Sequence, residues 1–142
     1  MSAEGVRLSG WALVLGASSG FGEATSLALA RAGLHIFGVH LDRKATLPNA
    51  DRIAAEIRRL GREAHFFNVN AADPEKRAEV AGQMQKTLEE RGEAGTLRVL
   101  LHSLAFGTLK LYVADPLKDA VTQAQMDMTL DVMAHSLVYW TQ

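Results

Sequence analysis

The chain has 142 residues, of which 48% are hydrophobic and 22% are charged, and its formal net charge at pH 7 is −1. These totals predict one globular domain over residues 1–142, and they argue against nucleic acid or an anionic membrane as the main partner. The sequence contains no cysteine, which excludes disulfides and thiolate metal sites. It shows no secretory signal and no apolar run of the ~18 residues that a membrane helix needs, so we expect a cytoplasmic protein.

The predicted elements alternate between apolar strands and helices. Residues 11–15 (WALVL) form a short unbroken apolar run, which is typical of a strand buried on both faces. Residues 23–32 are rich in alanine and favour a helix that ends at Gly33. A second strand is predicted at residues 34–41, followed by a helix at 49–60 with its apolar side chains on one face.

The same alternation continues through the second half of the chain. Asp73 is a capping residue and Pro74 suits the first helical position, so together they open a third helix. The remaining elements are predicted at residues 63–70 (strand), 73–91 (helix), 97–103 (strand), 112–116 (irregular) and from about 120 to the end (helix). Four alternating strand–helix units predict an α/β fold with a doubly wound parallel sheet of about four strands and helices on both faces. Because the last helix still carries a large apolar cluster where the chain stops, we expect the fold to be truncated after the fourth unit.

Three glycines, Gly16, Gly20 and Gly22, lie in the stretch GASSGFG between the first predicted strand and the first helix. A strand, a glycine-rich turn and a helix N-terminus in this order form a pyrophosphate site: the glycines allow the tight turn, the approach of the phosphates and close packing of helix on strand. Free N–H groups of the helix face the anion, and the hydroxyls of Ser18 and Ser19 add donors. Since any tight turn from strand to helix needs glycine, a purely structural loop is the alternative.

The stretch GASSGFG resembles the cofactor loop of the short-chain dehydrogenases/reductases, which bind NAD(H) or NADP(H) on a Rossmann-type sheet. The resemblance covers nearly the whole chain, although Leu15 stands where the family usually has Thr. It implies that the chain is the cofactor-binding half of an NAD(P)H-dependent oxidoreductase. The family transfers a proton with a Tyr that a nearby Lys assists, but neither Tyr112 nor Tyr139 has a Lys four residues later. The resemblance therefore implies no catalytic residue here, and the 142 residues alone are expected to be inactive.

The same resemblance places other residues along the cofactor. His40 falls where the family contacts the adenosine ribose, and Arg43 and Lys44 follow it. Basic groups clamp a 2′-phosphate, so NADP(H) is favoured and NAD(H) is the alternative; a plain solvated turn competes with both. The remaining positions implied to line the cofactor are Phe21, Asn68, Val69, Ser103, Leu104 and Ala105.

The segment HSLAF, residues 102–106, resembles the corresponding loop of the enoyl-acyl-carrier-protein reductases, which act on acyl thioesters. Met133 fits the same branch, because most other members of the family have Asn at the matching place. A local hydrogen bond explains His102 better than catalysis does, and the spacing of the five histidines predicts no metal site.

A second hypothesis treats the chain as a complete non-catalytic module that binds a nucleotide or pairs with another chain. Its interface would be the apolar stripe of the last helix, and the same stripe predicts a homo-oligomer if the chain is part of a reductase. The stripe consists of Met126, Leu130, Met133, Leu137, Val138 and Trp140.

Overall fold

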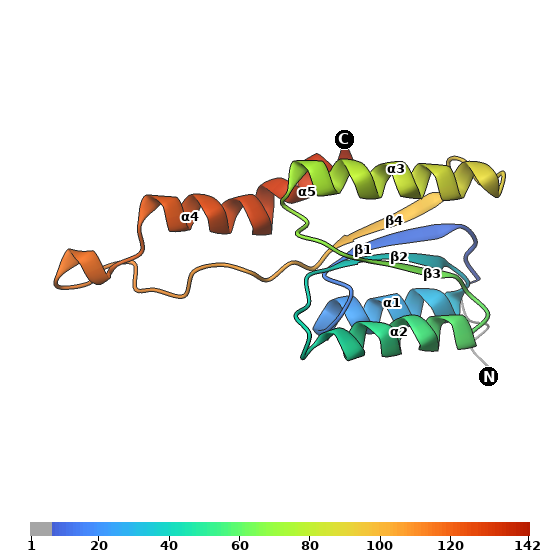
Figure 1. Cartoon of the computed structure of the whole chain (residues 1–142), viewed down its shortest axis with the longest axis horizontal. Coiled ribbons are helices and arrows are strands. Elements are labelled where there is room, and N and C mark those ends of the chain that lie inside the picture. The colour runs from blue at the N-terminus through green and yellow to red at the C-terminus, as the bar shows by residue number, and fades with distance from the viewer. Residues whose placement is uncertain (1–6) are drawn as a thin grey trace. The chain divides into compact units, whose positions relative to one another are not determined.

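The computed structural model describes residues 7–142, and the chain divides into two compact units between Ser103 and Leu104. The first unit is a four-stranded, fully parallel sheet with the strand order β3-β2-β1-β4 (Figure 1). Its strands are β1 (Trp11–Leu15), β2 (His35–His40), β3 (Ala64–Asn68) and β4 (Leu97–His102). Its helices are α1 (Gly20–Ala32), α2 (Leu47–Arg59) and α3 (Pro74–Glu90). The predicted fold class is confirmed, whereas a single domain over residues 1–142 stays a prediction.

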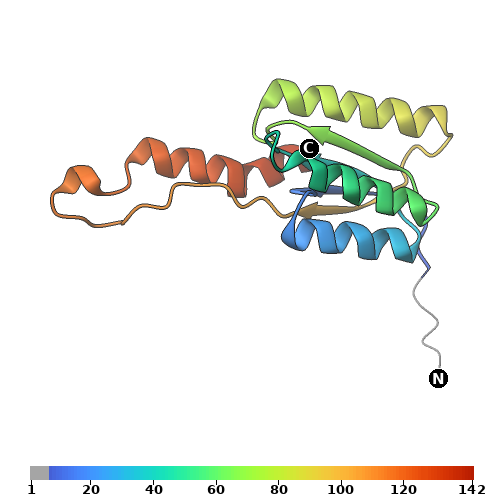
Figure 2. The same cartoon turned by 60° about the horizontal axis from the view of Figure 1, so that its bottom comes forward.

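Helices cover both faces of this sheet, with α1 and α2 on one face and α3 on the other (Figures 1 and 2). Because side chains of a strand alternate between the faces, every strand contributes to both layers. Ala12, Val14 and Ile36 belong to the core beneath α1 and α2, together with Ile53 and Ile57 of α2. This packing explains why β1, which has a strand on each side and helices over both faces, is an unbroken apolar run in the sequence.

Two helices begin earlier than the sequence predicts. The first begins at Gly20 rather than at residue 23, because the extended residue Ser19 precedes it and the two glycines Gly20 and Gly22 form its first turn. Glycine is a weak helix former, so propensity alone misses this turn. The second begins at Leu47 rather than at residue 49, with Pro48 in its first turn, where the missing N–H costs nothing.

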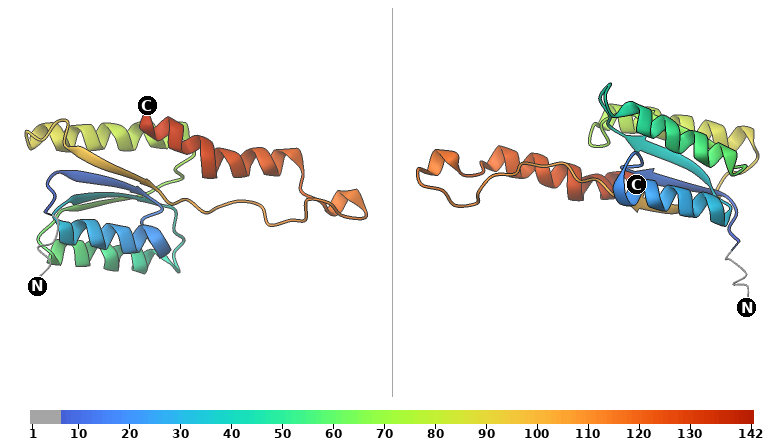
Figure 3. Two further views of the ribbon diagram at one scale, coloured as in Figure 1. Left: turned by 180° about the vertical axis from the view of Figure 1, so that it is seen from behind. Right: turned by 90° about the horizontal axis from the view of Figure 1, so that it is seen from below.

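The second unit starts with an extended segment that leads to the short helix η1 (Leu117–Asp119) (Figure 3). A continuous helical run follows, made of α4 (Gln123–Leu130), the π-helical turn η2 (Asp131–His135) and α5 (Ser136–Thr141). The predicted terminal helix is confirmed, but it begins three residues late because Thr122 and Gln125 form a capping box. No helix among residues 7–142 has the length and apolar character needed to cross a membrane.

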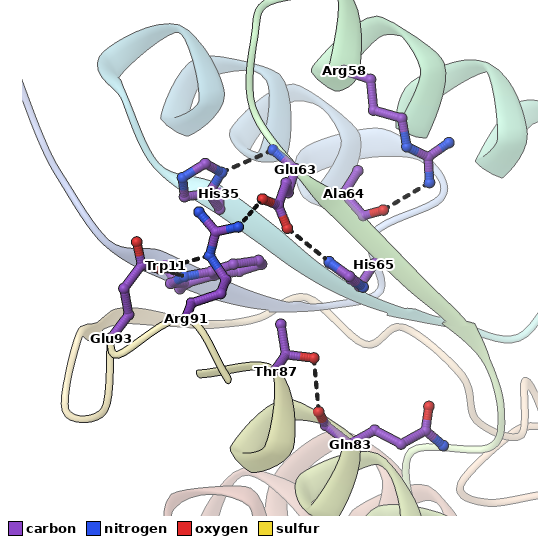
Figure 4. Close-up of polar contacts among 10 residues, drawn as sticks. All are labelled: Trp11, His35, Arg58, Glu63, Ala64, His65, Gln83, Thr87, Arg91 and Glu93. Atoms are coloured by element: carbon purple, nitrogen blue, oxygen red, sulfur yellow. Dashed lines mark hydrogen bonds and ion pairs between the residues drawn. The ribbon is translucent and has the colours of Figure 1, made fainter. Parts of the chain in front are cut away.

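An aromatic and charged cluster closes the end of the sheet where the strands begin (Figure 4). The Trp11 ring is fully buried and stacks on Phe37 with 4.2 Å between ring centroids. Its indole N–H donates a 2.7 Å hydrogen bond to Glu93, and Arg91 lies over the same ring while it pairs with Glu63. The cluster therefore joins the start of β1 to the connection between α3 and β4.

His35 in this cluster gives the fold a pH dependence. Burial lowers the pKa of His35, and the backbone N–H of Glu63 donates a 2.8 Å hydrogen bond to His35 Nδ1, which requires the unprotonated nitrogen. The unfolded chain therefore binds the proton more tightly, so we expect the free energy of unfolding to decrease as the pH falls below about 6.5. Urea unfolding at pH 7.5 and 5.5 measures this. In His35→Gln, which can still accept the bond, the decrease should be smaller; an equal decrease would contradict the assignment.

Candidate functional site

The glycine turn lies at the carboxyl end of β1, and its glycines meet two steric demands. Gly16 has φ +86° and Gly20 has φ +55°, both in the left-handed region that disfavours side chains. A Cβ on Gly22 would lie 1.9 Å from the carbonyl oxygen of Gly16. The N–H groups of Gly16 and Ala17 donate to the Val39 carbonyl at 2.8 and 3.0 Å, which fixes the turn against β2. The turn is thus a backbone cradle, and a side chain at residue 22 would force the start of α1 and the turn apart.

The strand order places this cradle where open α/β sheets bind ligands. From β1 the chain proceeds outward to β2 and β3, and then it crosses to β4 on the other side of β1. Such a reversal leaves a crevice at the carboxyl ends of the central strands. The N-terminus of α1 begins in the same place, and Ser19 makes no side-chain cap to it, which leaves its N–H groups suited to an anion.

The ends of β2 and β3 are joined by polar contacts beside the turn. The side chain of Asn68 accepts a 2.9 Å hydrogen bond from the Asp42 N–H and donates one of 3.0 Å to the Asp42 carbonyl. The N–H of Val69 donates to the carbonyl of His40 at 2.8 Å. On the other side of β1, the N–H of Ser103 donates to the Leu15 carbonyl at 2.8 Å and extends the ladder of β4. Four strand ends thus meet at one edge of the sheet.

Asp42 follows the end of β2 by two residues, and its carboxylate faces inward. His40 Nδ1 lies 2.8 Å from Asp42 Oδ2, and the two side chains are only 3% and 11% exposed. Burial by itself raises the pKa of Asp42, but hydrogen bonds from Ser18, Thr46 and His40 outweigh it and hold the pKa below its usual value. The carboxylate is therefore charged at neutral pH, and it links the glycine turn to the end of β2.

The remaining predicted cofactor residues lie on the surface or in the second unit. Arg43 and Lys44 lie on an exposed turn, where the N–H groups of Thr46 and Leu47 both donate to the Arg43 carbonyl at 2.9 Å. No ion pair holds either basic side chain within residues 7–142, so both are free to meet an anion. Phe21 is 85% exposed beside the cradle. Leu104 and Ala105 belong to the second unit, and their place along a cofactor stays a prediction.

Sequence reasoning missed a group that supports the turn from α2. Asn49 Nδ2 donates to the carbonyl of Ser18 at 2.5 Å, and Arg52 pairs with Glu23 in the first turn of α1. The hydrogen bond from Arg52 lowers the pKa of Glu23, which lies in the first turn of α1. The only signal in the sequence is that Asn49 stands at the start of a predicted helix, and that position does not reveal a partner 31 residues away.

A parallel sheet with a glycine turn at its reversal of strand order, an open helix N-terminus and polar neighbouring strand ends defines the Rossmann-type dinucleotide-binding proteins. Residues 10–142 match the family model of the short chain dehydrogenases. The chain belongs to the short-chain dehydrogenase/reductase family, whose members use NAD(P). The resemblance noted in the sequence is confirmed at the level of the family.

Individual relatives agree with this assignment. An uncharacterized oxidoreductase of Mycobacterium tuberculosis is 38% identical over 72 residues, which are 51% of this chain and 26% of that protein. A short chain dehydrogenase of Burkholderia cenocepacia, solved in complex with NADP, is 25% identical with a TM-score of 0.77; the match covers 96% of this chain and 50% of that one. The promiscuous reductase LugOII, which catalyses keto-reduction at C1 during lugdunomycin biosynthesis, is 27% identical with a TM-score of 0.76 over 96% and 50% of the two chains. The chain thus spans about half the length of these solved relatives.

Proposed function

We propose that this chain is the cofactor-binding half of an NAD(P)H-dependent oxidoreductase. The observation that carries the proposal is the cradle of Gly16, Gly20 and Gly22 at the carboxyl end of β1. Positive φ angles at Gly16 and Gly20 shape its backbone, and the lack of a Cβ at residue 22 lets the start of α1 pack directly against the turn. The nicotinamide of the bound cofactor would supply the hydride. The chain's own residues bind and orient: the N–H groups at the start of α1 meet the pyrophosphate, and Asn68 and Val69 lie where an adenine would rest.

For the cofactor, NADP(H) is favoured over NAD(H). Arg43 and Lys44 are exposed cations one and two residues beyond Asp42, the second member of the inward-facing pair of His40 and Asp42. Because the Asp42 carboxylate already accepts hydrogen bonds from Ser18, Thr46 and His40, it is poorly placed to accept the ribose hydroxyls of NAD(H). The two cations are instead suited to a 2′-phosphate. The NADP complex of the Burkholderia relative is in keeping with this preference.

Thermal unfolding with saturating NADPH, and separately with NADH, tests the proposal. A ligand at 100 times its dissociation constant adds about 2.7 kcal/mol to stability. We expect a rise in Tm of several degrees with NADPH, a smaller rise with NADH, and loss of the difference in a variant with both Arg43→Gln and Lys44→Gln. The variant with Arg31→Gln and Lys86→Gln removes two charges elsewhere in the first unit and should keep the preference. No rise with either cofactor would contradict the proposed site.

The substrate of the whole protein is proposed only by class. The likeness of residues 102–106 to the enoyl reductase loop favours an acyl thioester whose double bond is reduced. Purified whole protein with NADPH and a short enoyl thioester tests this by loss of absorbance at the NADPH band, with a simple ketone as the competing substrate. Turnover of the ketone alone would contradict the enoyl assignment.

The alternative function, a non-catalytic nucleotide-binding or dimerisation module, is favoured by one observation. Four residues of the predicted stripe are exposed, whereas Met126 and Trp140 are half-buried. Together with two neighbours, the exposed large apolar side chains of the terminal helical run are Met128, Leu130, Met133, Leu137, Val138 and Tyr139. Such a surface suits pairing with a second copy. Oxidoreductase activity of the whole protein would contradict the non-catalytic module and leave a homo-oligomer through this helix as a separate proposal.

A further inference from the structure

The side chain of Asn49 connects α2 to the glycine turn and the start of α1, which lie 31 and 26 residues earlier in the chain. It lies in the first turn of α2, and its Nδ2 donates to the carbonyl oxygen of Ser18 at 2.5 Å. The same nitrogen lies 3.3 Å from Oε2 of Glu23, in the first turn of α1. One amide group therefore reaches from α2 both to the glycine turn and to the helix that follows it.

Arg52 fixes which way this amide points. Its Nε and Nη2 donate to Asn49 Oδ1 at 3.1 and 2.7 Å, so the oxygen of the amide is held by two donors. The Nδ2 group must then face Ser18 and Glu23. Since Arg52 also pairs with Glu23, the side chains form a closed ring of contacts around the start of α1.

The glycine turn is flexible by composition, so contacts that hold its conformation should favour ligand binding. Ser18 lies between Gly16 and Gly20, which both have positive φ angles. Glycine can adopt many other backbone conformations, so this one is not fixed by the residues of the turn alone. A turn that has to be ordered when ligand binds loses affinity, because the conformational entropy is paid at that moment. Ser18 is held on its side chain by Asp42 and on its main chain by Asn49.

We propose that Asn49 is a positioning residue that holds the Ser18 carbonyl and thereby keeps the glycine turn in its pyrophosphate-binding conformation before the cofactor arrives. The role in cofactor binding rests on the proposed function. The contact of Asn49 with Ser18, here called the clamp, is present in the protein without ligand. Asn49 acts through the main chain of Ser18 and needs no contact with the cofactor. Asn49 should therefore affect binding of the pyrophosphate, which NADH and NADPH have in common.

Amide hydrogen exchange of the ligand-free protein tests the clamp directly. In Asn49→Asp the group that faces Ser18 becomes a carboxylate oxygen, which repels the Ser18 carbonyl and Glu23; Asn49→Ala only removes the donor. Loss of one hydrogen bond corresponds to roughly a tenfold change. We expect exchange in residues 16–22 to accelerate about tenfold in Asn49→Ala and more in Asn49→Asp. Gln83→Glu, an amide-to-acid change on the exposed side of α3, is the matched control and should leave this segment unchanged.

Two exchange results would overturn the inference. One is unchanged exchange in residues 16–22 in both variants. The other is acceleration spread evenly over the whole first unit, because Asn49 would then serve general stability. Asn49→Ala decides the matter if Asn49→Asp does not fold.

Binding of the two cofactors supplies an independent readout. Titration calorimetry should show NADH and NADPH weakened by the same factor, roughly tenfold, in Asn49→Ala. A loss confined to NADPH would overturn the inference, because it would place Asn49 at the 2′-phosphate. If the unaltered protein binds neither cofactor, the proposed function fails, and the exchange experiment still decides whether Asn49 holds the turn.

Discussion

Gly22→Ala is expected to destabilise the protein by about 3 kcal/mol and to abolish measurable NADPH binding. The added methyl would lie 1.9 Å from the carbonyl oxygen and 2.7 Å from the carbonyl carbon of Gly16. Both are main-chain atoms of the turn, so the clash cannot be relieved by rotating a side chain. Either α1 moves away from β1 or the turn deforms, and each change removes the cradle. Urea unfolding measures the loss of stability, and a titration with NADPH measures the loss of binding.

The matched control is Gly82→Ala on α3. A Cβ at this exposed helical position meets no atom within 4 Å, so the same substitution should stabilise the protein by about 0.5–1 kcal/mol. The opposite signs separate the steric argument from any general effect of replacing glycine with alanine. A Gly22→Ala variant with unchanged stability and NADPH affinity would show that the turn tolerates a side chain, and it would remove the main support for the cofactor site.

Trp11→Ala is expected to cost about 4 kcal/mol of unfolding free energy, because it truncates the largest of the fully buried side chains among the described residues. The ring is fully buried, stacks on Phe37 and lies 4.8 Å from the ring of His35. Its removal leaves a cavity between β1, β2 and α3, where the aromatic partners cannot close in without moving strands. Chemical unfolding monitored by circular dichroism gives the value, and a cost below about 1 kcal/mol would contradict the packing described.

Trp11→Phe separates packing from hydrogen bonding at the same position. It keeps an aromatic ring against Phe37 but loses the indole N–H that donates to Glu93 at 2.7 Å. Glu93 remains partly exposed and can turn to water, so we expect a cost of about 1–2 kcal/mol. If Trp11→Phe and Trp11→Ala cost the same, the hydrogen bond rather than the ring would dominate.

Local sequence patterns were sufficient for the elements and for the glycine turn. Three features depend on residues that are close in the chain, and a local pattern therefore predicts them. They are the apolar run of β1, the capping pair of Asp73 and Pro74, and the three glycines of the turn. The side chain of Asp73 does accept hydrogen bonds from the N–H groups of Glu75 and Lys76, as an N-cap should. These patterns are also what made the family recognisable. Where local preference was weak, as at the glycine-bearing start of α1, the predicted boundary was wrong by three residues.

By itself, then, the sequence determined the alternating strands and helices, the glycine turn and the family. The tertiary structure alone decided which distant groups meet. Strand order puts β1 between β2 and β4, the inward-facing carboxylate of Asp42 reaches Ser18, and Asn49 holds the turn from another helix. The indole N–H of Trp11 donates a hydrogen bond to Glu93, which is 82 residues away in the chain. The physical reason is that a hydrogen bond or ring contact between distant residues imposes no periodicity and no local backbone preference, so it leaves no pattern in a single sequence and exists only once the sheet has formed.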